Sequence, residues 1–175
     1  MSNSRTALDK DVMTASDRGG GIAGNIVIIL LLAFFAYNQA ANTGFFTSSF
    51  GPLEAFLFYA AGVVSMIAPT IRAITGRRSS ARWVDLGSAI MWSITTIWLL
   101  YVFPFNFAHL TDALPAFLRF TLSWVNNQVG WVILLLAAIG STISAIYYAA
   151  RIVMDRLARQ PSQQVRKELG QEATM

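Results

Sequence analysis

The chain has 175 residues, of which 55% are hydrophobic and only 13% are charged. A soluble domain carries about 25% charged residues, because its surface must be wetted, so this composition excludes an ordinary water-soluble domain. The chain has no cysteine, which excludes disulfides and thiolate chemistry. Its net charge of +4 comes from basic residues that flank apolar segments, which argues against nucleic acid as a partner.

Four long stretches of the chain carry no charged residue: 22–41, 55–71, 86–111 and 120–150. A soluble core of this size cannot bury four such stretches, whereas the hydrocarbon core of a bilayer can. The sequence therefore predicts an all-α polytopic integral membrane protein, with the lipid bilayer as its first partner.

The N-terminal part is predicted to be a polar tail over residues 1–21, with Gly19–Gly21 as a flexible joint. The first span is predicted at 22–41, because its length at 1.5 Å per residue matches a hydrocarbon core of roughly 30 Å. The leading region is long and carries three acids, and no small-residue cleavage site follows the apolar run. We therefore expect this segment to stay in the protein as a span.

The second and third spans are predicted at 53–74 and 83–103. Pro52 and Glu54 are typical of a helix start, and Asp85 takes the same first-turn position in the third span. Pro104 is expected to end the third span.

The segment after Pro104 is predicted to lie flat at the outer membrane interface, as an amphipathic helix over about 111–126. A membrane span here would carry Asp112, Arg119 and a central Pro115, and each is unfavourable inside a bilayer. As a helix, it would instead place the two charged residues on a narrow polar stripe opposite a broad apolar side. Phe105 and Phe107 are expected to join an aromatic belt at that depth.

The fourth span is predicted at about 129–154, followed by a short polar helical end that Pro161 breaks and by a solvated tail within 155–175. Small residues recur every four positions along it, which lets helix backbones approach closely. They are Ala137, Ser141, Ala145 and Ala149. Their partner is expected to be the second span, through Ala61, Gly62 and Ser65, or another subunit.

The distribution of basic residues predicts that both termini lie on the cytoplasmic side of the cell inner membrane. Twelve of the thirteen Lys and Arg residues fall before the first span, between the second and third, or after the fourth. The residues that fix this orientation are Arg72, Arg77, Arg78, Arg82, Arg151, Arg156 and Arg159. Arg119 is the one exception.

The outer side offers one candidate polar site, composed of Glu54, His109, Asp112 and Arg119. These residue types suit either a binding point or the wetted rim of an interfacial helix, and the second interpretation is preferred. His109 is also a weak candidate for axial ligation of a haem or chlorophyll-type ring. No spacing predicts a metal site or a catalytic constellation, so the chain is expected to bind no cofactor and not to be an enzyme.

Three functions from different classes remain open. The preferred hypothesis is a non-catalytic structural or accessory subunit that packs with other membrane proteins or with itself. The second is an oligomeric channel or carrier for a small solute. The third is a membrane enzyme with an outer-face site at Glu54, His109 and Asp112.

Overall fold

A computed structural model describes residues 12–112, 114, 119, 120, 122 and 124–172, with the side chains of 155 and 158–172 excepted. The described residues form helices and no strand, apart from two isolated β-bridges. The long helices are α2 (Ala15–Ala40), α3 (Pro52–Thr75), α4 (Arg82–Val102) and α6 (Asn127–Glu172). Short 3₁₀ turns, η1 (Arg78–Ala81) and η2 (Phe107–His109), precede α4 and follow it.

The four long helices are each long and apolar enough to cross a membrane, which confirms the predicted all-helical fold with four candidate spans. The candidate spans end close to the predicted positions at α3 and α4. Pro52 begins α3, and Glu54 accepts a hydrogen bond from the Gly51 backbone N–H at 3.0 Å, as a capping box requires.

The start of the first helix differs from the prediction. α2 begins at Ala15 and passes through Gly19–Gly21 without a break, so the flexible joint predicted there is wrong. The Thr14 hydroxyl accepts from the Asp17 N–H at 3.2 Å, and the Asp17 carboxylate accepts from the Thr14 N–H at 3.2 Å. This reciprocal cap offsets the low helix propensity of the three glycines.

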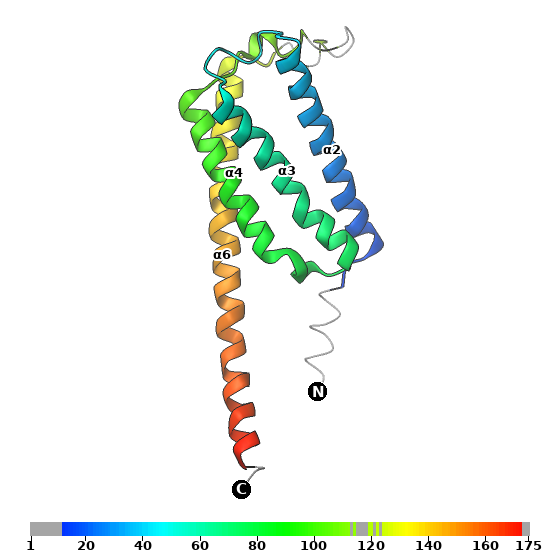
Figure 1. Cartoon of the computed structure of the whole chain (residues 1–175), viewed down its shortest axis with the longest axis vertical. Helices are drawn as coiled ribbons and strands as arrows, with labels where there is room; N and C mark the ends of the chain where they lie inside the picture. The colour runs from blue at the N-terminus through cyan, green and yellow to red at the C-terminus, as the bar shows by residue number, and fades with distance from the viewer. Residues whose placement is uncertain (1–11, 113, 115–118, 121, 123, 173–175) are drawn as a thin grey trace.

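The last helix also runs further than predicted. α6 continues through Pro161 to Glu172 and projects well beyond the other helices (Figure 1), so the prediction that Pro161 breaks it is wrong. Proline removes a single backbone hydrogen bond and costs roughly 3 kcal/mol inside a helix. The Gln, Arg, Lys and Glu residues around it are good helix formers, and the helix persists.

The predicted interfacial helix at 111–126 is described only in fragments. Residues 113, 115–118, 121 and 123 lie outside the described residues. Of the described residues, 111 and 112 form a turn after η2, and residues 119, 120 and 122 are helical. The interfacial helix therefore stays a prediction.

The helices pack in the order of the chain. α2 packs against α3, α3 against α4, and α4 most extensively against α6. Among the described residues, the first and last helices do not pack against each other. The arrangement is an open row with α6 beside α4, visible in Figure 1.

The most deeply buried apolar residues lie at the end of the row where the 41–51 and 103–110 loops meet. Phe45, Leu99 and Phe105 are nearly inaccessible there. The Asn106 N–H donates to the Phe45 carbonyl at 2.7 Å, and the Thr47 N–H donates to the Pro104 carbonyl at 3.0 Å. Phe105 thus belongs to the core, and its predicted place in an aromatic belt is wrong.

Candidate functional site

The predicted outer-face residues fall into two separate groups. The His109 Nδ1 lies 2.8 Å from the Asp112 Oδ2, and Arg119 donates to the backbone carbonyl of Asp112 at 3.3 Å and to that of Leu114 at 2.9 Å. The His109 and Asp112 side chains are about half exposed. The side chains of this group therefore bind one another and the backbone of the same segment.

Glu54 does not join that group. Its carboxylate accepts from the Gly51 backbone and, at 2.9 Å, from the indole N–H of Trp98. Trp98 lies on α4, so this carboxylate both caps α3 and ties it to its neighbour. Within the described part of the chain, no hydrogen bond connects Glu54 with His109, Asp112 or Arg119.

His109 lies against the first loop. A Cβ added at Gly44 would be 3.1 Å from the imidazole Cδ2, and Gly44 has a positive φ of 88°. The ring is therefore held between Gly44 and Asp112. Among the described residues, no group of three or more His, Asp or Glu side chains is arranged to hold a metal ion.

Of the predicted small residues of the last span, Ser141 contacts α4, and so does the neighbouring Thr142. The Ser93 hydroxyl lies 2.7 Å from that of Thr142, and the Thr96 hydroxyl lies 3.3 Å from that of Ser141. The second span was the expected partner, yet α6 packs chiefly on the third. Gly62 of α3 instead receives the Leu32 side chain of α2, because a Cβ there would lie 2.7 Å from the Leu32 Cδ2.

The predicted orientation-determining arginines gather at one end of the row. Arg72 Nη1 donates to Asp85 Oδ2 at 2.8 Å, and Arg78 Nη2 donates to Asp17 Oδ2 at 2.7 Å. The other contacts at this end link Arg77 to Val12 by a β-bridge, Arg151 to the Tyr147 hydroxyl, and Arg156 to the Trp83 ring. Arg82 begins α4, and the Arg159 side chain lies outside the described residues.

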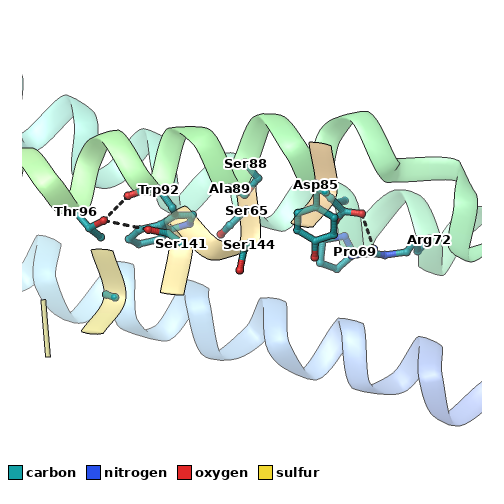
Figure 2. Close-up of a pocket in the computed structure, with 13 residues that line it drawn as sticks. Ser65, Pro69, Arg72, Asp85, Ser88, Ala89, Trp92, Thr96, Ser141 and Ser144 are labelled. Carbon is teal, nitrogen blue, oxygen red and sulfur yellow. Dashed lines mark hydrogen bonds and ion pairs between the residues drawn. The ribbon is translucent and has the colours of Figure 1, made fainter. Parts of the chain in front are cut away.

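A groove lies between α3, α4 and α6 and extends away from this arginine-rich end. Its volume is about 350 Å³. Figure 2 shows the Arg72–Asp85 ion pair at one end and the Thr96–Ser141 contact at the other. Small and hydroxyl-bearing side chains line it in between, including Ser65, Ala68, Ser88, Ala89 and Ser144.

Sequence patterns did not reveal this groove, because its residues come from three helices whose pairing the sequence does not fix. From the sequence alone, Arg72 is expected to fix the orientation of the chain, and Asp85 is expected in the first turn of a helix. A cation near the end of one span and an acid at the start of the next is the pattern that predicts an ion pair between them. Such residues meet when the two helices are antiparallel and the loop is short.

No known protein family, curated protein or solved structure matches this chain.

Proposed function

We propose that this chain is a non-catalytic integral membrane protein that serves as an accessory subunit and packs against another membrane protein. In this proposal it resides in the cytoplasmic membrane with both termini inside. The other membrane protein places a helix against α2.

The exposure of large apolar side chains supports the membrane location. Ile26, Leu30 and Leu31 on α2 are each at least half exposed, and so are Ile133, Leu136 and Ile143 on α6. Water does not tolerate continuous apolar faces of this extent on a monomer. The hydrocarbon core of a bilayer does, since its interior is as apolar as these side chains.

The observation that supports the accessory role is a pair of glycines on α2 that no other side chain contacts among the described residues. Gly20 and Gly24 are four residues apart and therefore lie on one face of the helix. A Cβ added at either position would meet nothing within 4 Å. Glycine inside a helix costs roughly 0.5–1 kcal/mol relative to alanine, and no contact from the described residues compensates for it here.

Two other helical glycines, Gly62 and Gly130, receive a side chain, whereas Gly19, Gly87 and Gly140 are open in the same way as Gly20 and Gly24. A Cβ at Gly62 would clash with Leu32, and one at Gly130 would clash with the Phe107 ring. Among the described long helices, α2 packs mainly on α3. Its two open glycines have the spacing that favours close approach of helices in membranes, and they suit a helix from another protein.

The test compares the native assembly of the wild type and of two variants in a mild detergent. Gly20→Leu combined with Gly24→Leu adds bulk on the open face, and Ala33→Leu is the matched control on a different, exposed face of α2. We expect the wild type and Ala33→Leu to migrate as one larger assembly in native electrophoresis, and the glycine variant to migrate as the free subunit.

The same native gels can also contradict the proposal. If the wild type is recovered alone as a monomer, the accessory role is wrong. If the glycine variant assembles as the wild type does, α2 is not the contact surface. Circular dichroism of the glycine variant should match the wild type, because among the described residues no atom lies within 4 Å of a Cβ added at either position.

A further inference from the structure

The groove between α3, α4 and α6 has the depth of one bilayer leaflet. It runs along α4 from Asp85 to Thr96 and along α6 from Tyr148 to Ala137. Eleven residues at 1.5 Å per residue give a length of about 16 Å, which is half of a hydrocarbon core of roughly 30 Å. Its volume of about 350 Å³ is within the range of small-molecule sites.

The end of the groove at the arginine-rich side carries a net positive charge. Arg72 and Asp85 form an ion pair, and Arg151 also interacts electrostatically with the Asp85 carboxylate. Two cations and one anion leave one positive charge uncompensated among these three residues. The Arg72 side chain is 25% exposed, and its guanidinium carries five N–H donors.

Two hydroxyl groups at the same end are also available. Ser88 and Tyr148 line the groove beside Arg72 and Asp85, and neither hydroxyl has a hydrogen-bond partner among the described residues. Guanidinium and hydroxyl donors together are the groups that bind an anionic oxygen such as that of a phosphate.

The deeper walls are effectively apolar. The Ser65 hydroxyl donates to the Gly62 carbonyl at 2.6 Å, and the Ser144 hydroxyl donates to the Gly140 carbonyl at 2.8 Å. These hydroxyls are satisfied by their own helices, so they present little polarity to the groove. Ala68, Pro69, Ala89, Trp92 and Ala137 also line the groove.

We propose that this groove binds one anionic phospholipid of the leaflet on the arginine-rich side. The phosphate lies beside Arg72, Ser88 and Tyr148, and one acyl chain extends between α3, α4 and α6 as far as Thr96. The second acyl chain remains in the bilayer, because the groove is open on one side.

The binding test uses native mass spectrometry of the full-length protein in detergent with three lipids of equal chain length. They are phosphatidylglycerol, phosphatidylcholine and the corresponding free fatty acid. We expect phosphatidylglycerol to bind at least tenfold more tightly than each of the other two. Equal binding of phosphatidylcholine excludes anion selectivity, and tighter binding of the fatty acid excludes a phospholipid as the occupant.

Two variants locate the site. Arg72→Gln combined with Asp85→Asn removes both charges of the pair and should weaken phosphatidylglycerol binding at least tenfold. Arg78→Gln is the matched control, because Arg78 lies at the same end of the row but pairs with Asp17 outside the groove. Equal losses in both variants, or no loss in the first, overturn the proposal.

A third variant tests the site independently, in case the variant with both charges removed does not fold. Ala137→Leu fills the deep end of the groove at an exposed helix position and leaves every charged residue in place. We expect it to displace the acyl chain and to weaken phosphatidylglycerol binding at least fivefold. Unchanged binding in Ala137→Leu overturns the proposal, and neither result bears on the glycine face of α2.

Discussion

Polar side chains inside the candidate spans differ in where their hydrogen bonds go, and this decides their role. The Ser65 hydroxyl donates to the Gly62 carbonyl of its own helix, and Thr96 Oγ1 both donates to the Trp92 carbonyl of its own helix and lies 3.3 Å from the Ser141 hydroxyl of α6. Ser93 and Thr95 also make contacts across helices, to Thr142 and to the Leu57 carbonyl. Such interhelical bonds are worth roughly 0.6–2 kcal/mol each in lipid. They therefore fix the register of neighbouring helices without dominating stability.

The Arg72–Asp85 ion pair should show an asymmetric response to removal of either partner. The Asp85 side chain is 9% exposed and that of Arg72 is 25% exposed. Arg72→Gln leaves a buried carboxylate without its cation, which costs about 3 kcal/mol or more. Asp85→Asn should cost less, because the long arginine side chain can extend to the interface.

Thermal unfolding of the purified protein in detergent measures this difference. The expected order of Tm is wild type, then Asp85→Asn, then Arg72→Gln as the lowest. The double variant should recover part of the loss of Arg72→Gln, since the buried position 85 then carries no charge. A double variant below both single variants would contradict the buried-charge explanation.

At the level of helices, the sequence predicted the ends that local chemistry determines. Pro52 and Glu54 begin α3, and Pro104 follows the end of α4, because these residues act on their own helix. The predicted start of α2 is too late, although Thr14 and Asp17 have the spacing of a capping box. The three glycines that follow favour a flexible segment, and the prediction relied on them. The neighbour of α6 was missed because small residues permit close packing but do not select a partner.

The same reason explains why the candidate site was only partly predictable. The His109–Asp112 contact links residues three apart in the chain, and a short spacing of this kind is visible in a sequence. The groove depends on α3, α4 and α6 meeting, and on Gly62 turning toward Leu32 rather than toward α6. Pairing of this kind depends on the whole set of helix contacts, which one sequence does not determine.

The contact between α2 and α3 gives a prediction for a single glycine. Gly62→Ala places a Cβ 2.7 Å from the Leu32 Cδ2, so the leucine must move. Overpacking of this kind costs about 1–3 kcal/mol, of which the better helix propensity of alanine offsets about 1 kcal/mol. Leu32→Ala in the same chain should restore part of the stability. The measurement is Tm in detergent.

Gly24→Ala is the control for that prediction. A Cβ at Gly24 has open space around it, and alanine is a better helix former by about 1 kcal/mol. We expect its Tm to equal or exceed that of the wild type. A Tm decrease equal to that of Gly62→Ala would show that neither change acts through the Leu32 contact.

For the whole molecule, the two ends of the helix row differ in chemistry. The described arginines of the orientation set lie at the end formed by η1, the start of α2 and the exit of α6 from the row. The opposite end holds the phenylalanine-rich core with Phe45 and Phe105. Moving arginine through a bilayer centre costs at least roughly 2.5–3.5 kcal/mol, so this asymmetry favours one orientation.

That orientation can be measured directly because the chain has no cysteine. Ser49→Cys places a thiol on the exposed loop between α2 and α3, and Ser80→Cys places one in η1 at the arginine-rich end. With the arginine-rich end in the cytoplasm, a membrane-impermeant maleimide should label Ser49→Cys in intact cells. It should label Ser80→Cys only after permeabilisation, since the bilayer separates the two ends of the row. Labelling of Ser80→Cys in intact cells, with Ser49→Cys protected, would show that the arginine-rich end faces outward and that the charge asymmetry does not determine how this chain is inserted.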